Sequence, residues 1–221
     1  MYDPKQVKDF HKSVIAVKNR ARKKYPHIGE DNDNGEWVFC DEFYRMCDSF
    51  RAVAANSAVQ DLTPETIDDL LYAIARDNEC PMLINEISSD LYRVLCKAVL
   101  DTPYTNAKWE FAETLKDHGE DEEIRPLIFE FLDTGDEYTE RMALRSLAFL
   151  YPEKTEEYAE KFWNREIYKN DEYQKIMVLH ALYIIGSSKL SHYLYMACRS
   201  SLKYLKENAD EIRAELEGDN R

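Results

Sequence analysis

Histidine and cysteine are the residue types in this chain best suited to binding metals or to nucleophilic catalysis. The five histidines show neither the H-x-x-x-H nor the H-E-x-x-H spacing that places two imidazoles on one face of a helix; they are His11, His27, His118, His180 and His192. The cysteines are odd in number, widely spaced and without a C-x-x-C pair; they are Cys40, Cys47, Cys80, Cys96 and Cys198. We therefore expect no disulfide framework, no zinc site and no catalytic thiol.

Motifs that carry other common chemistry are also missing. The chain contains no G-x-S-x-G, no G-x-x-x-x-G-K-[ST] and no G-x-G-x-x-G, which argues against the usual hydrolase, nucleotide and dinucleotide sites. Carboxylates are so numerous that some pair will always look catalytic, and such a pair carries no weight. We expect a protein that is not an enzyme and needs no cofactor.

The segment Gly29–Gly35, with the sequence GEDNDNG, alternates Asp and Asn in the manner of a calcium-binding loop. In a loop that begins at Asp31, the twelfth position is Glu42, as an EF-hand requires. The sixth position, however, is Glu36, where the sharp turn of that loop needs glycine. The sequence predicts a polar linker here.

Charge is unevenly distributed along the 221 residues, which include 29 Lys and Arg against 43 Asp and Glu. Residues 1–25 carry eight Lys and Arg and only two Asp, for a net charge of +6, so the remainder stands at −20. A region with this negative charge repels phosphate groups, which disfavours binding to nucleic acid and to anionic membranes. It attracts basic proteins. The basic run Lys18–Lys24 favours salt bridges to this acidic body, and the alternatives are a nucleic-acid patch and contacts with other proteins.

Hydrophobic residues make up 44% of the chain, enough for a globular core, and no run approaches the roughly 20 apolar residues that span a bilayer. The N-terminus lacks the apolar stretch of a secretory signal, so we expect a cytoplasmic protein. Apolar residues recur at helical spacing from the start. One face is Val7, Phe10, Val14, Val17 and Ala21, and others run along 39–53, 67–74 and 84–98. No alternating strand pattern occurs, which predicts an all-α fold.

A repeat begins near residue 102. Tyr104, Tyr138 and Tyr173 stand 34 and 35 residues apart and open three similar segments. Eight residues beyond each tyrosine stands a small residue, in turn Ala112, Ser146 and Ala181, where helices can approach closely. A breaker then separates two helices in each segment: His118-Gly119, Tyr151-Pro152 and Gly186-Ser187. A helix–turn–helix unit of this period indicates an α-solenoid.

The segments DEYTERMALRSLAFLYPEKTEEY and DEYQKIMVLHALYIIGSSKLSHYL resemble HEAT-like repeats of the PBS-lyase type, over about residues 102–200. The resemblance implies a right-handed α-solenoid of helical hairpins. Residues 1–100 would form an N-terminal helical region, either a cap or degenerate repeats, and residues 101–221 the repeats with a C-terminal helix. HEAT-like repeats serve as binding scaffolds, so the resemblance implies binding and assigns no active site.

Aromatic residues crowd the repeat region, and they serve either as solenoid core or as an interface. They are Tyr138, Tyr151, Tyr158, Trp163, Tyr168, Tyr173, Tyr183, Tyr193 and Tyr195. We expect a protein-binding protein whose acidic, aromatic-rich surface engages a basic protein, as bacterial immunity proteins engage toxins. The expected contact residues are Glu120, Glu122, Glu123, Tyr168 and Tyr195. The alternatives are a nucleic-acid enzyme resembling the alkyl-purine DNA glycosylases and an adaptor scaffold. The oligomeric state stays open.

Overall fold

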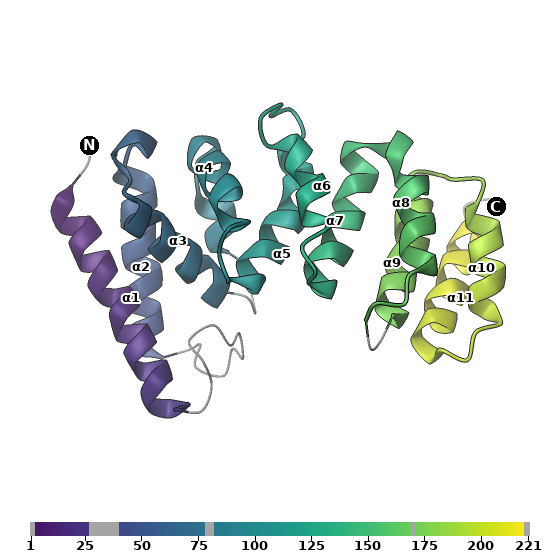
Figure 1. Cartoon of the computed structure of the whole chain (residues 1–221), viewed down its shortest axis with the longest axis horizontal. Helices are drawn as coiled ribbons and strands as arrows, with labels where there is room; N and C mark the ends of the chain where they lie inside the picture. The colour runs from purple at the N-terminus through teal and green to yellow at the C-terminus, as the bar shows by residue number, and fades with distance from the viewer. Residues whose placement is uncertain (1–2, 27–39, 78–81, 169–170, 219–221) are drawn as a thin grey trace. The chain divides into compact units, whose positions relative to one another are not determined.

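The structure is a computed structural model that describes residues 3–26, 40–77, 82–168 and 171–218. Within these ranges the chain forms eleven α-helices and four short 3₁₀ turns, with no strand (Figure 1). The all-α prediction is confirmed. The calcium-like segment 29–35, His27 and Cys80 lie outside the described residues.

The chain forms two compact units, and each is described by itself. Unit 1 comprises Met1–Phe111 and Asp121–Leu127, and unit 2 comprises Ala112–Glu120 and Ile128–Arg221. The division at 100 expected from the sequence stays a prediction. Unit 1 contains α1 (Pro4–Lys24), α2 (Asp41–Asn56), α3 (Pro64–Arg76), α4 (Ser89–Val99) and most of α5 (Thr105–Thr114).

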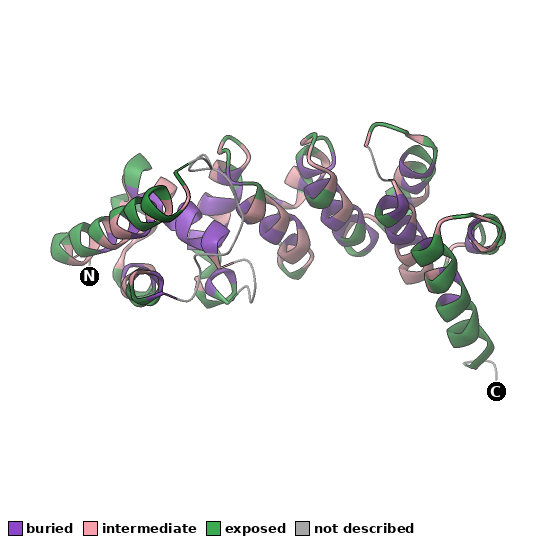
Figure 2. Cartoon of the chain, turned by 90° about the horizontal axis from the view of Figure 1, so that it is seen from below, coloured by how far each residue is buried: buried purple, intermediate pink, exposed green. Residues whose placement is uncertain are grey.

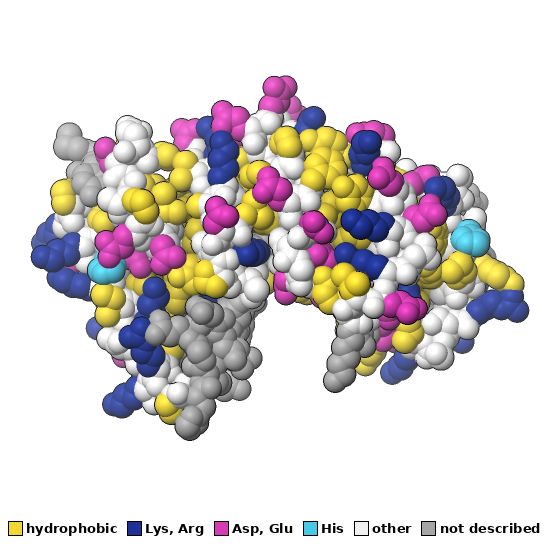
Figure 3. Space-filling model, viewed as in Figure 1, with side chains coloured by type: hydrophobic (Ala, Val, Ile, Leu, Met, Phe, Trp, Pro, Cys, Tyr) yellow, Lys and Arg dark blue, Asp and Glu magenta, His cyan; other side chains and the backbone are white. Residues whose placement is uncertain are grey.

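Two helices of unit 1 begin at capping side chains, and the apolar face expected near the N-terminus is buried. Asp3 caps α1, and Thr63 caps α3 by accepting a hydrogen bond from the backbone N of Thr66 at 3.2 Å, with Pro64 in the first turn. The expected face of α1 is buried at Phe10, Val14 and Val17. Its basic C-terminal half lies along the edge of the unit in Figure 3, where Lys18 Nζ is 3.9 Å from Asp68 and Arg20 NH1 is 3.2 Å from Glu42.

Unit 2 is built from the remaining helices, arranged as consecutive hairpins. They are α6 (Ile128–Phe131), α7 (Glu137–Leu150), α8 (Pro152–Asn164), α9 (Glu172–Ile184), α10 (Leu190–Cys198) and α11 (Lys203–Gly218). Helices α7, α9 and α11 lie side by side in that order, while α8 packs on α7 and α9, and α10 packs on α9 and α11. Figure 2 shows their buried residues on the faces turned toward neighbouring helices.

The predicted column of small residues is buried at all three positions, because Ala112, Ser146 and Ala181 have no exposed surface. Ser146 Oγ donates a hydrogen bond to the Glu113 carbonyl at 2.9 Å, so its hydroxyl is satisfied where η3 (Leu115–His118) and α7 approach. Gly186, the third breaker, has a φ of 62°, a left-handed conformation that glycine adopts without strain.

The first predicted repeat differs from the other two. Tyr138 and Tyr173 are each the second residue of their helix, whereas Tyr104 precedes α5 and is buried in unit 1. The second helix expected after His118-Gly119 is a 3₁₀ turn (Arg125–Leu127) followed by the one-turn α6. Helix α6 stops after one turn, ahead of a turn in which Gly135 has a φ of 76°, a left-handed conformation that glycine adopts without strain. The HEAT-like solenoid remains an interpretation.

Candidate functional site

Three exposed tyrosines at the starts of α7, α9 and α11 form a connected row in unit 2. Tyr138, Tyr173 and Tyr204 have 40%, 43% and 47% of their surface exposed. The Arg141 guanidinium lies 4.5 Å from the Tyr138 ring centroid and 5.4 Å from that of Tyr173, and so bridges the two. The Tyr173 and Tyr204 rings stack at 6.2 Å with planes 18° apart. We call these four residues the tyrosine ladder.

Side-chain hydrogen bonds hold the first turns of α7 and α11, which carry two rings of the ladder. Asp136 caps α7 by accepting a hydrogen bond from the backbone N of Thr139 at 2.8 Å. Glu172, beside Tyr173 in the first turn of α9, accepts from the backbone N of Tyr204 at 2.7 Å and of Leu205 at 3.1 Å. One residue pair of α9 therefore holds both the backbone and the ring of Tyr204.

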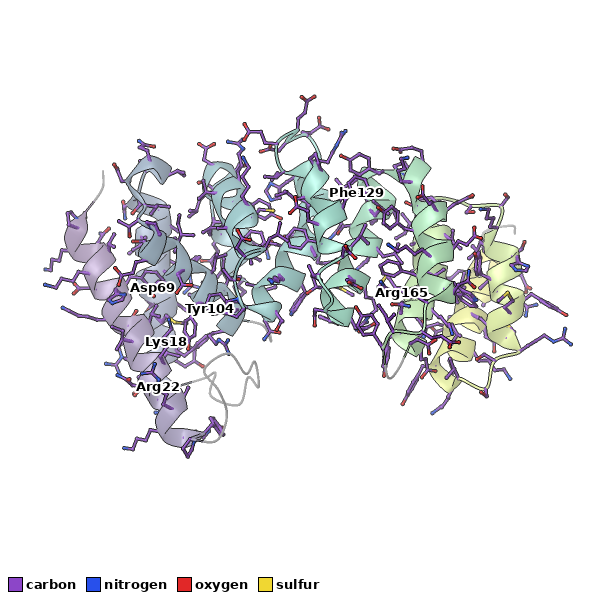
Figure 4. The ribbon with its side chains drawn as sticks, viewed as in Figure 1. Lys18, Arg22, Asp69, Tyr104, Phe129 and Arg165 are labelled. Carbon is purple, nitrogen blue, oxygen red and sulfur yellow. The ribbon has the colours of Figure 1, made fainter. Side chains whose placement is uncertain are left out.

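A buried polar network links the same helices. Glu140 of α7 is 2% exposed and accepts hydrogen bonds from Tyr168 Oη at 2.7 Å and from the Gly135 backbone N at 2.9 Å. Arg165, labelled in Figure 4, lies 2.7 Å from the Glu140 carboxylate and donates through Nε to Gln174 Oε1 at 2.7 Å. Burial and the carboxylate of Glu140 raise the pKa of the Tyr168 hydroxyl, which keeps it a neutral donor.

The charge of Arg141 is balanced within the protein. Its Nε lies 3.0 Å from Glu137 Oε1 on the preceding turn of α7. Burial raises the pKa of Glu137, while Arg141 acts in the opposite direction. The ladder therefore presents π faces and phenolic hydroxyls rather than a net positive charge. Aromatic faces of this kind can contact cationic and apolar groups.

The site residues expected from the sequence have different surroundings. Glu120 and Glu122 are exposed, and Glu123 is exposed but accepts a hydrogen bond from Lys97 Nζ at 2.7 Å, which lowers the pKa of Glu123. Tyr168 is half-buried in the network just described. Tyr195 is 60% exposed and lines a groove between α10 and α11. Their role in partner binding stays a prediction.

Sequence reasoning missed two members of the ladder, Arg141 and Tyr204. Tyr204 lies 31 residues after Tyr173 and is likewise the second residue of its helix. The tyrosine spacing of the repeats could therefore have indicated Tyr204. Arg141 was not detectable, because its position between two rings depends on how α7 packs against α9.

A second aromatic cluster of unit 2 lies over α6 and α8. The Phe129 ring, labelled in Figure 4, is 4.9 Å from that of Tyr151 and 5.9 Å from that of Tyr158. All three residues are half-buried, and hydrophobic side chains gather in this region of Figure 3. Their rings span neighbouring helices, as the core interpretation of the aromatics expects, so this cluster is a weaker candidate than the ladder.

Polar clusters of unit 1 join α1 to α3. His11 Nδ1 is 2.7 Å from Asp69 Oδ2, and its Nε2 is 3.3 Å from Glu65. Nearby, Tyr104 Oη donates to Asp68 at 3.0 Å, and Lys18 lies over the Tyr72 ring (Figure 4). Within the described ranges, no three His, Cys, Asp or Glu side chains are arranged to hold a metal ion.

Comparison with known proteins adds no relative. No family model matches the chain, and no curated protein or solved structure shows significant similarity to it. In the part of the chain that the structure describes, no helix is long and apolar enough to cross a bilayer.

Proposed function

We propose that this chain is a non-catalytic protein-binding protein and that the tyrosine ladder is the centre of its binding surface. The supporting observation is the ordered, exposed row of Tyr138, Arg141, Tyr173 and Tyr204. Tyrosine and arginine are the residue types that dominate binding energy at interfaces. Rings held in place before binding lose little conformational entropy on association.

The partner that fits this surface is a basic protein. Each unit is acidic, with 15 Lys and Arg against 22 Asp and Glu in unit 1 and 14 against 21 in unit 2. Acidic fields accelerate the approach of a basic protein, and exposed tyrosine faces accept Lys or Arg side chains through cation–π contacts. A toxin neutralised by an immunity protein is one partner of this kind.

Quantitative affinity capture from the native host tests the proposal. The full chain is compared with the triple variant Tyr138→Ala/Tyr173→Ala/Tyr204→Ala and with Tyr44→Ala, a matched control in unit 1 whose side chain is 52% exposed. We expect the full chain and the Tyr44→Ala control to capture equal amounts of a basic protein. The triple variant should capture at least about tenfold less of it.

Binding of the purified partner then tests the interface directly, by titration against the same three proteins. Equal affinity of the full chain and the triple variant would exclude the ladder as the interface. Capture of DNA in place of a protein would favour the nucleic-acid enzyme alternative. The described structure offers little support for that alternative, because Lys18 and Arg20 of α1 lie close to carboxylates.

A further inference from the structure

The tyrosine ladder is one edge of a larger exposed face of unit 2. Helices α7, α9 and α11 lie side by side, and each has a ladder tyrosine as its second residue (Figure 1). At 3.6 residues per turn, the positions seven and eleven residues after a tyrosine lie on the same side of its helix. These positions hold Arg145 and Phe149 on α7, His180 and Ile184 on α9, and Glu211 and Glu215 on α11. We call these six residues and the ladder the α7–α9–α11 face.

Contacts between the helices show that this face is continuous. All six added side chains are exposed or partly exposed. At the ladder, the rings of Tyr173 and Tyr204 stack, which brings the first turns of α9 and α11 together. Farther along, His180 Nε2 and Asn208 Oδ1 lie 3.2 Å apart in a hydrogen bond between the same two helices. A partner that covers the ladder therefore also reaches the residues one to three turns beyond it.

The charge of the face differs between its two sides. On the α7 side, Arg141 and Arg145 each have a carboxylate within 3.0 Å, so their charges are balanced, and Phe149 is 52% exposed. On the α11 side, Glu211 and Glu215 are exposed, and within the described ranges neither carboxylate has an ion-pair or hydrogen-bond partner. The face is thus aromatic and neutral toward α7 and negatively charged toward α11.

The glutamates of α11 oppose the stability of their own helix. Glu207, Glu211 and Glu215 follow one another at four-residue intervals, and like charges at this spacing destabilise a helix. Lys203 lies 3.8 Å from Glu207, but no basic residue stands three or four positions from either of the other two. Residues that break a local rule in this way are typical of functional surfaces. Their position beside exposed tyrosines fits a role in binding.

We propose that Glu211 and Glu215 bind the cationic side chains of the basic partner and determine its specificity. The matching partner surface has an apolar patch, which covers the ladder and Phe149, and Lys or Arg side chains on one side of that patch. Those cations lie over α11, because the carboxylates on the α7 side are already paired. The inference rests on the proposed function, since it assigns the partner's charges to one side of a surface centred on the ladder.

Binding of a fluorescein-labelled nona-arginine peptide tests the assignment, because this probe carries only the cationic groups in question. Fluorescence anisotropy at about 0.1 M salt, where charges are screened over about 10 Å, compares the full chain with two variants. One is Glu211→Gln/Glu215→Gln, called the α11 variant. The other is Glu153→Gln/Glu157→Gln, a matched control that removes two exposed carboxylates four residues apart on α8.

We expect the α11 variant to bind the peptide at least about fivefold more weakly than the full chain, and the control to bind almost as the full chain does. All four positions are exposed, so both variants should fold, which circular dichroism checks. Unchanged binding by the α11 variant would overturn the proposal, as would an equal loss in the variant and its control. A full chain that does not bind the peptide would overturn it too.

The triple tyrosine variant separates this inference from the proposed function. If its binding of the peptide is unchanged while the α11 variant binds weakly, the result counts against the ladder as the centre of the surface and supports the glutamates. If the triple variant binds weakly and the α11 variant does not, the ladder is supported and the assignment of the cations to α11 is wrong.

Discussion

Ala181 has no exposed surface and lies in α9, which packs against α7, α8 and α11. We expect Ala181→Leu to lower the free energy of unfolding by about 1–3 kcal/mol through overpacking. The measurement is thermal or denaturant unfolding. Ala214→Leu on the exposed side of α11 is the matched control and should change stability little. Equal stabilities of the two variants would contradict the assignment of the small-residue column to helix contacts.

Asp69 gives unit 1 a pH dependence whose direction can be derived. Burial raises the pKa of its carboxyl, while the hydrogen bond to His11 acts in the opposite direction. Because the folded-state pKa lies above the unfolded value of about 3.9, the folded state binds the proton more tightly. The stability contributed by this group is complete below the unfolded pKa and is lost as the pH rises through the folded pKa.

Asp69→Asn removes this titration. We therefore expect the difference in melting temperature, native minus variant, to decrease as the pH rises from about 4 to about 7. Parallel thermal melts of the two proteins across this range provide the measurement. A difference that stays constant or increases with pH would show that the carboxyl does not titrate as its burial implies.

At the scale of elements, a single side chain of α9 caps the first turn of α11. Glu172 Oε1 accepts from two backbone N–H groups of the first turn of α11, and one of these bonds is buried. Glu172→Ala leaves both donors without this partner and should lower the free energy of unfolding by about 1–3 kcal/mol. Glu172→Gln retains an acceptor oxygen, so its free energy of unfolding should fall much less. Denaturant unfolding of the two variants therefore distinguishes the capping hydrogen bonds from general packing.

Sequence patterns predicted helices where they depend on local chemistry. Apolar spacing predicted the buried faces of α1, α2, α3 and α4. The second helix expected after His118-Gly119 was wrong in extent, because the structure has a 3₁₀ turn and the one-turn α6 there. Two of the four ladder residues could also be predicted, because the tyrosine repeat period includes Tyr138 and Tyr173. The contacts of Arg141 with the two rings arise only from packing between helices.

At the scale of the molecule, charge governs how fast a partner arrives. If a basic protein binds, the reversals Glu120→Lys and Glu122→Lys should lower its association rate at least severalfold at low salt and much less at high salt. Stopped-flow or surface kinetics at two salt concentrations provide the measurement. The reversal Glu123→Lys also breaks the contact with Lys97 and is therefore tested separately. An association rate independent of salt would exclude electrostatic steering.

The stacked rings of Tyr173 and Tyr204 have a calorimetric consequence. Side chains that are already immobile lose little rotational freedom when a partner covers them, so the entropic penalty of binding should be small. Removing Arg141 or one ring of the stack would release the others, and the same contact area would then form with a larger unfavourable entropy. In titration calorimetry, partner binding to Arg141→Ala should therefore have a more unfavourable entropy than binding to the native protein. The heat-capacity change of binding should be nearly the same for both, because the apolar area buried changes little.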